Sequence, residues 1–120
     1  MQDAKAFWLA AAECYIRECR IRRRAVCAAE FAASMGRTPV QLVREFRVAV
    51  GAGVKDYLSA RQIAHAKELL RTTRRSTAEI AVESGFGTAR SFYRAFKRAA
   101  GSSPTAFRKE MSLAGMEVGN

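Results

Sequence analysis

The sequence predicts an all-α fold built from two copies of one helical unit, which a long helix joins. Apolar residues recur three and four positions apart along most of the chain, and this is the spacing of one face of a helix. The sequence has no sustained period-two alternation and no Asn-Gly or Asp-Gly hairpin turn, so signals for strands are missing. An internal repeat on either side of the long helix indicates the two copies.

The first predicted helix covers about residues 4–17. The face that we expect to be buried carries residues at helical spacing: Phe7, Ala11, Cys14 and Tyr15. The segment RECRIRRRA that follows interrupts this pattern, and we interpret it as a basic linker. Its run of Arg22, Arg23 and Arg24 is either a solvated stretch or a clamp on phosphate groups.

Three further helices follow in order. A helix over about residues 28–35 ends at Gly36, because glycine tolerates the positive φ of a tight turn. Thr38 and Pro39 open the next helix, which runs to about residue 50, as a capping residue followed by proline at the first helical position. A long helix over about residues 55–71 has an apolar face that consists of Tyr57, Leu58, Ile63, Ala66 and Leu70.

The repeat is the most informative feature of the chain. The segment AAEFAASMG, which starts at Ala28, parallels TAEIAVESG, which starts at Thr77, with an offset of 49 residues. After the turn the offset becomes 50, so that Thr38 pairs with Thr88. The one inserted residue falls at a turn, where insertions are tolerated best. The sequence therefore predicts two copies of one supersecondary unit.

Each copy has the spacing of a helix-turn-helix. A small residue is followed four positions later by glycine, and six or seven positions further by a large apolar residue: Ala32, Gly36 and Leu42 in the first copy, Ala81, Gly85 and Phe92 in the second. Two helices that cross steeply through a short turn require this pattern. In a helix-turn-helix, the second helix enters the major groove of DNA and its exposed N-terminal residues meet base edges.

The segment GFGTARSFYRAFKRAAG separates an aromatic stripe from a basic one. Four phenylalanines of the second copy share one apolar face, so we assign them to the core rather than to base stacking: Phe86, Phe92, Phe96 and Phe107. The arginines of the segment lie on the opposite side of the same helix. We therefore expect this helix to press positive charge against a partner.

Twelve positions are expected to contact DNA. They are, in the first copy, Thr38, Pro39, Val40, Val43, Arg44 and Arg47, and in the second copy Thr88, Ala89, Arg90, Ser91, Arg94 and Lys97. Arg90 and Arg94 lie one turn apart and suit a bidentate contact with guanine, whereas Thr38 and Val40 could touch thymine methyl groups. Two alternatives stay open: the arginines could pair with carboxylates or be solvated, and the valines could be packing residues.

Composition favours an anionic partner. The net charge is +10, the pI is about 10.4 and 49% of residues are hydrophobic, which indicates a folded basic domain rather than a disordered tail. Of the 21 basic residues 16 are arginine, whose planar fork suits phosphate and guanine edges, so nucleic acid is favoured over a membrane surface. No apolar stretch approaches the ~20 residues that span a bilayer, and we expect a soluble, cytoplasmic protein.

The chain carries no enzyme signature. His65 is the only histidine, and no serine, cysteine or carboxylate pair surrounds it at the spacing of a triad or dyad. Cys14, Cys19 and Cys27 follow a Cx4Cx7C pattern, which lacks the fourth ligand and the paired close spacing of a zinc site. We expect free thiols in a reducing compartment, without catalytic residues, metal or cofactor. A redox-sensing role for the thiols stays open.

Residues 4–108 resemble the DNA-binding domain of AraC/XylS-type bacterial transcription regulators. The C-terminal signature of that family is present as GFGTARSFYRAFKRAAGSSPTAFR, and the connecting segments YLSARQIAHAKELLRTT and STAEIAVESGF also fit. The resemblance implies a seven-helix bilobed domain of two homeodomain-like bundles, in which both recognition helices point toward one face of DNA. The expected divisions are 1–53 for the first lobe, 54–72 for the linker helix, 73–110 for the second lobe and 111–120 for a tail.

The resemblance also implies a function. Consecutive major-groove segments are ~34 Å apart, so one monomer could read a bipartite site in double-stranded DNA. Family members usually activate transcription at promoters and contact RNA polymerase, and small stand-alone members lack a ligand-sensing domain, so no small-molecule effector is expected. The alternatives are a repressor, an antagonist that dimerises with a relative, the C-terminal part of a longer ligand-sensing regulator, or a protein that compacts DNA without sequence specificity.

Overall fold

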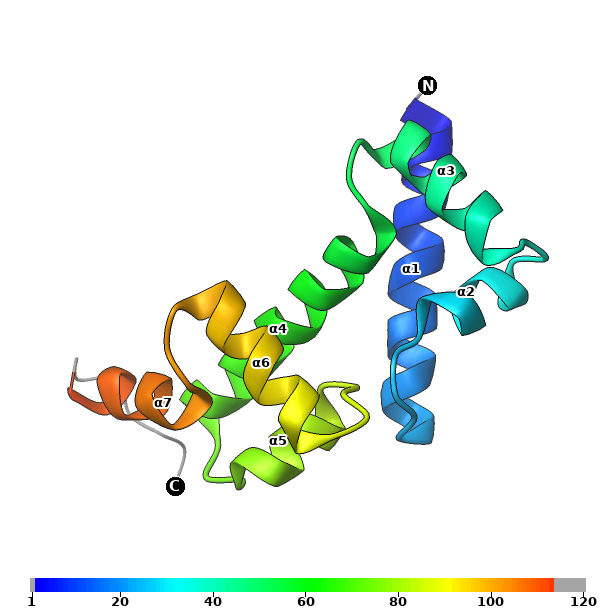
Figure 1. Cartoon of the computed structure of the whole chain (residues 1–120). Coiled ribbons are helices and arrows are strands. Elements are labelled where there is room, and N and C mark those ends of the chain that lie inside the picture. Colours follow the sequence, from blue (N-terminus) through cyan, green and yellow to red (C-terminus); the bar gives the residue numbers. More distant parts are fainter. Residues whose placement is uncertain (1, 114–120) are drawn as a thin grey trace.

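The computed structural model describes residues 2–113, which form seven α-helices and contain no strand (Figure 1). The prediction of an all-α fold is therefore confirmed. The helices are α1 (Gln2–Arg22), α2 (Ala28–Ser34), α3 (Pro39–Val50), α4 (Val54–Thr72), α5 (Thr77–Glu83), α6 (Ala89–Ala100) and α7 (Pro104–Leu113). Residues 114–120, which make up most of the tail expected at 111–120, lie outside the described residues.

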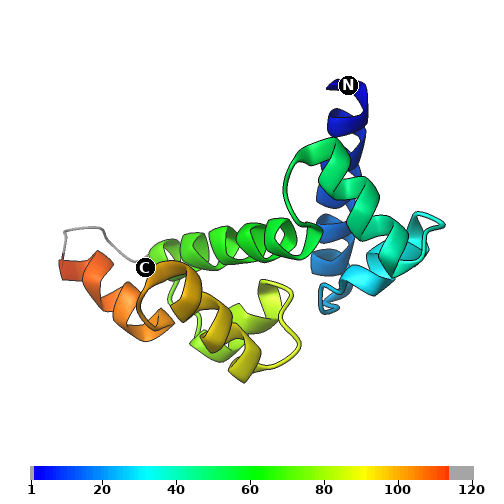
Figure 2. The same ribbon diagram turned by 45° about the horizontal axis from the view of Figure 1, so that its top comes forward.

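Two helical lobes lie at opposite ends of α4. Helices α1, α2 and α3 pack at its N-terminal end and α5, α6 and α7 along its C-terminal part (Figures 1 and 2). The molecule is elongated, with extents of 44 × 26 × 23 Å. Helix α4 belongs to both hydrophobic cores, because Val54 and Leu58 pack into the first lobe and Ile63, Ala66 and Leu70 into the second.

Aromatic side chains fill the core of the first lobe. Trp8 meets Phe31 of α2 and Phe46 of α3 edge-on, with ring centroids 6.3 and 6.1 Å apart. Ala32 is fully buried where α2 approaches α3, and Gly36 has a φ of +69° in the turn between them. The first helix-turn-helix therefore forms at the residues where its spacing predicts it.

The second lobe repeats this arrangement with phenylalanine. Phe92 and Phe96 of α6 are fully buried, and Phe86 and Phe107 pack against them, so the predicted core role of all four is confirmed. Arg108 of α7 donates hydrogen bonds to the carbonyl oxygens of Leu70 and Thr73, each at 3.2 Å. These bonds join α7 to the C-terminal end of α4, where helix carbonyls otherwise lack partners.

Two expectations about the first helix are wrong. The helix runs on through most of the presumed basic linker and ends at Arg22, because Cys19 extends the buried stripe and arginine is a good helix former. The buried face is also rotated: Phe7 is 54% exposed and Cys14 is exposed, while the core receives Trp8, Ala12, Ile16 and Cys19. The large indole of Trp8 decides this rotation by packing between Phe31 and Phe46.

The loop between α1 and α2 contacts the turn between α5 and α6, and this contact joins the two lobes. The Val26 N–H donates a hydrogen bond to the Gly85 carbonyl oxygen at 2.8 Å. From α4, the side chain of Gln62 donates to the same oxygen at 2.9 Å and to that of Ser84 at 3.2 Å. On the surface of this contact, Arg23 pairs with Glu83 at 3.1 Å. We call the contact of Val26, Gln62, Ser84 and Gly85 the lobe lock.

The backbone of Gly85 is essential to the lobe lock. Its φ is +82°, and a Cβ built there would lie 2.7 Å from Val26 Cγ2. Gly85→Ala is therefore expected to lower the free energy of unfolding by about 2 to 4 kcal/mol, through left-handed backbone strain and the clash. Gly87→Ala is the matched control, because the nearest atom to its added methyl, Ala25 Cβ, lies at an ordinary 3.7 Å. Equal stability of the two variants in chemical denaturation would contradict the prediction.

Candidate nucleic-acid interface

The sequence of α6 produces a helix with one buried aromatic side and one basic side. Thr88 caps its start by accepting a hydrogen bond from the Ser91 N–H at 3.0 Å. Phe92 and Phe96 anchor the helix in the core. The side chains of Arg90 and Arg94, in the first and second turns, are exposed on the opposite side. The geometry expected of a recognition helix is therefore present in the second lobe.

Helix α3 occupies the equivalent place in the first lobe. Thr38 and Gln41 form a capping box, in which the Gln41 N–H donates to Thr38 Oγ1 at 3.1 Å and the Thr38 N–H donates to Gln41 Oε1 at 2.9 Å. Pro39 follows at the first helical position, and Leu42 and Phe46 are fully buried. These interactions fix the start of α3 and leave its other side exposed.

The two recognition helices lie on one face of the molecule. In both ribbon views α3 and α6 run in the same direction on the side of α4 that faces the viewer in Figure 1 (Figures 1 and 2). All twelve residues expected to contact DNA are exposed: Thr38, Pro39, Val40, Val43, Arg44, Arg47, Thr88, Ala89, Arg90, Ser91, Arg94 and Lys97. Val40 and Val43 are 72% and 44% exposed, so they are not the packing residues of the alternative interpretation.

Ion pairs involve arginines that lie outside the recognition helices. Within residues 2–113, carboxylates pair with seven of them: Arg22, Arg23, Arg24, Arg37, Arg61, Arg71 and Arg75. In the same range, no ion pair involves the cations of the recognition helices, which are Arg44, Arg47, Arg90, Arg94, Lys97 and Arg98. Helix α6 contains no carboxylate, and Glu45 of α3 pairs with Arg37 at 3.1 Å. Within the described residues, the positive charge of the recognition helices is therefore not neutralised by an ion pair.

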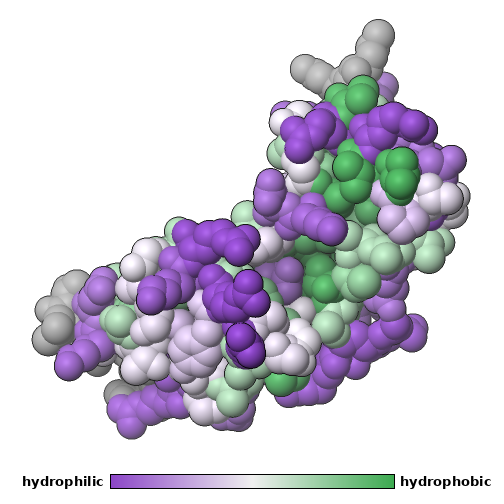
Figure 3. All heavy atoms as spheres, viewed as in Figure 1, coloured by the Kyte–Doolittle hydropathy of each residue, from purple (hydrophilic) through white to green (hydrophobic). Residues whose placement is uncertain are grey.

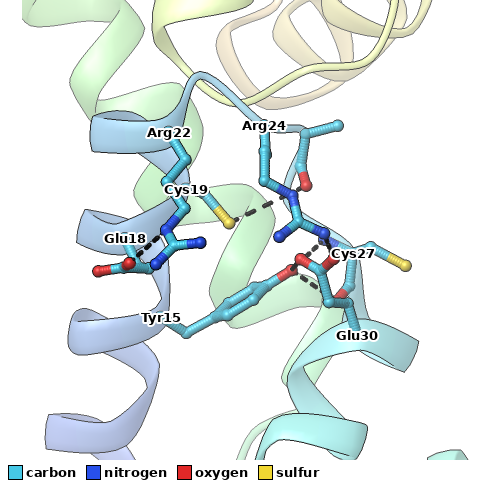
Figure 4. Close-up of polar contacts among 8 residues, drawn as sticks. Tyr15, Glu18, Cys19, Arg22, Arg24, Cys27 and Glu30 are labelled. Atoms are coloured by element: carbon cyan, nitrogen blue, oxygen red, sulfur yellow. Dashed lines mark hydrogen bonds and ion pairs between the residues drawn. The ribbon is translucent and has the colours of Figure 1, made fainter.

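The arginine run after α1 is engaged in the scaffold. Arg22 pairs with Glu18 at 2.5 Å, and Arg24 pairs with Glu30 (Figure 4). Tyr15 lies beside this pair, where its hydroxyl accepts from the Cys27 N–H at 3.0 Å and donates to Glu30 at 2.8 Å. These contacts hold the start of α2 against α1, so a structural role for the run is observed.

The predicted set omits two cations that the structure places nearby. Arg98 lies one turn beyond Arg94, and the two line a shallow hollow together with Ser91. Lys55, at the start of α4, lines a groove beside α3. The four-residue spacing of Arg90, Arg94 and Arg98 in the sequence indicates that Arg98 shares their face. Lys55 comes close only through the packing of α4 against α3.

The remaining candidate groups are His65 and the three cysteines. Burial lowers the pKa of His65, and the nearby Arg20 adds to this effect. Burial raises the pKa of the Cys19 thiol, while Cys14 and Cys27 are exposed and all three thiols are free. Among residues 2–113, no group of three His, Cys, Asp or Glu side chains is placed to hold a metal ion. In that part of the chain no helix has the length and apolar character needed to cross a membrane.

Comparison with known proteins agrees with this geometry. A family model described as a helix-turn-helix domain, of the AraC type, matches residues 31–110. The chain belongs to the AraC/XylS family. It is thus a DNA-binding helix-turn-helix domain of an AraC-type transcription regulator. A search of curated proteins found no significant match.

Solved structures similar to this AraC-type domain cover most of it. A protein of unknown function from Listeria innocua is 28% identical, with a TM-score of 0.72 over 84% of this chain and 94% of that one. The C-terminal domain of AraT, a response regulator from Geobacillus stearothermophilus, is 25% identical, with a TM-score of 0.70 over 83% and 84%. The DNA-binding domain of AdpA, a global transcriptional factor, in complex with a target DNA, shares the fold at 23% identity and a TM-score of 0.72, over 86% and 94%.

Proposed function

We propose that this AraC-type domain binds a bipartite site in double-stranded DNA as a monomer and recognises its sequence with both α3 and α6. The observation that carries the proposal is the pair of exposed recognition helices on one face, whose arginines have no carboxylate partner within residues 2–113. Because one chain carries two recognition helices, it can contact both half-elements of the site without a second chain. The DNA complex of the similarly folded AdpA domain supports double-stranded DNA as the partner.

The proposed contacts follow from the exposed side chains. Arg90 and Arg94 project from the first two turns of α6, where a helix-turn-helix meets base edges, and each can form a bidentate pair with guanine. Lys97 and Arg98 lie further along α6 and suit phosphate contacts. In the first lobe, Arg44 offers the equivalent donor to a base or phosphate.

Arg47 differs from the other cations. A methyl group built at Gly53 would lie 3.1 Å from its Nη2, so its guanidinium extends over the loop after α3. We therefore assign it to the DNA backbone rather than to a base. Thr38 and Thr88 cap the two recognition helices, and their neighbours Pro39, Ala89 and Ser91 form the remaining surface at the helix starts.

At a promoter, this mode of binding would place the domain beside RNA polymerase, and we propose an activator. The similarity to AraT, whose matching part is the C-terminal domain of a response regulator, supports one alternative, that the domain acts as the C-terminal part of a longer regulator. Both functions use the same DNA-binding face and act on DNA in the cytoplasm.

Selection from random duplex DNA at near-physiological salt tests the proposal. We expect enrichment of a motif with two half-elements about one helical turn apart, bound by one chain per duplex in analytical ultracentrifugation. The selected site should bind at least about 10³ times more tightly than bulk DNA. Strong, salt-dependent binding without any motif would instead indicate non-specific compaction, and two chains per site would contradict the monomer.

Arg94→Ala tests the role of α6. It is expected to weaken binding to the selected site by roughly 5- to 150-fold and to relax the preference at one base pair, because a bidentate guanine contact is lost. Arg71→Ala is the matched control: it also removes one positive charge, but Arg71 lies on α4 and pairs with Glu68. Equal affinity of both variants in a titration against the same duplex would show that Arg94 does not contact a base.

A further inference from the structure

The exposed start of α3 is poor in hydrogen-bonding groups. Pro39 has no N–H, and the side chains of Val40 and Val43 are apolar although they are 72% and 44% exposed. Thr38 Oγ1 and Gln41 Oε1 each accept a backbone N–H in the capping box, so both side-chain oxygens are engaged there. Base pairs that meet this surface would therefore contact methyl groups. The equivalent part of α6 presents the guanidinium groups of Arg90 and Arg94.

A groove beside these valines is also apolar. It has a volume of about 540 Å³ and lies between the starts of α2 and α4 and the exposed side of α3. Ala28, Ala29 and Pro39 line it together with the two valines, and the cations of Arg44 and Lys55 border it. Figure 3 shows a hydrophobic patch on this lobe, whereas the surface over α6 is hydrophilic.

We propose that this groove receives the C5-methyl groups of thymines in the major groove, an inference that rests on the proposed DNA-binding function. Thymine is the standard base that presents a methyl group there, and apolar side chains are its usual partners. Arg44 and Lys55 complement the phosphates that flank the base edge. The two lobes therefore read by different chemistry: the first detects methyl groups and the second detects guanine.

Thymine methyl groups can be removed without altering base pairing, by substituting deoxyuridine in the selected duplex. With thymines of the first half-element replaced, wild-type affinity is expected to fall about fourfold for each buried methyl group lost. The same replacement in the second half-element is the control and should leave affinity unchanged. Val40→Ala with Val43→Ala should bind the normal duplex more weakly and respond less to deoxyuridine, because the methyl contacts are already missing.

Each other outcome overturns the proposal. The thymine proposal is wrong if the wild-type protein binds thymine and deoxyuridine duplexes equally, or if the first half-element contains no thymine. Either result leaves the proposed function unaffected. The absence of any selected motif defeats both. If the free protein dimerises and Val40→Ala abolishes the dimer, a second copy of the chain occupies the groove instead.

A second inference concerns the lobe lock. Gln62 is a polar residue that is only 7% exposed, and both of its hydrogen bonds go to the turn that leads into α6. On the other side of this turn, Val26 belongs to the loop that leads into α2. The turn before α6 is thus bonded both to α4 and to the loop before α2, so the two lobes are joined by more than the length of α4.

We infer that Gln62 is a positioning residue that sets the permitted spacing between the two half-elements. One inserted base pair moves the second half-element by about 3.4 Å and about a tenth of a turn, which a locked pair of lobes cannot follow. The wild-type protein should therefore bind duplexes with one base pair added or removed at least about tenfold more weakly.

A spacing profile, which is the binding affinity measured against the number of base pairs between the half-elements, separates a positioning role from an effect on general stability. Gln62→Leu is expected to flatten the profile and to leave the base preference within each half-element unchanged. Ile80→Val is the control, because it reduces packing in the second core without touching the lock. Glu83→Ala, which removes the exposed pairs with Arg23 and Arg75, should flatten the profile partly and provides a second test if Gln62→Leu fails to fold. A wild-type protein that tolerates all spacings, or variants with unchanged profiles, would refute the inference.

Discussion

The contact between Val26 and Gly85 is the constraint on which the arrangement of the whole molecule depends. A backbone hydrogen bond of 2.8 Å crosses between the lobes at a point where no side chain fits on Gly85. Gln62 donates to the same carbonyl oxygen from the middle of α4, so three separate segments meet at one buried site. Buried polar groups are costly unless they are paired, and a shift of either lobe would leave these groups without partners. The contact joins the lobe that carries α3 to the lobe that carries α6.

Charge is distributed in a way that fits the same architecture. Six carboxylates of the described chain pair with arginines of the scaffold, as in Arg37 with Glu45 and Arg61 with Glu13. Exposed ion pairs contribute only about 0 to 1 kcal/mol each, so these pairs do little to hold the fold together. Their consequence is electrostatic: they neutralise the scaffold and leave the positive charge of the recognition helices for a polyanion.

The two lobes share a backbone plan and differ in surface chemistry. Each has a small residue in the first helix of its motif and a positive-φ glycine in the turn, and large apolar residues anchor its second helix. The exposed sides have diverged: valines and a proline begin α3, and arginines project from α6. A duplicated fold therefore carries two different exposed surfaces, and in the proposed function these suit an asymmetric site better than a palindrome.

Local sequence patterns predicted the class of fold, the two helix-turn-helix units, the capping residue of α3 and the buried role of Phe92 and Phe96. These features depend on residues three to seven positions apart, and local spacing reports them directly. Three features depend on tertiary packing instead: the rotation of α1, the lobe lock at Gln62, and the groove beside α3 that Lys55 lines. Arg23 and Glu83 pair although 60 residues separate them along the chain. The packing of both lobes on α4 brings them together, and no local sequence pattern encodes this packing.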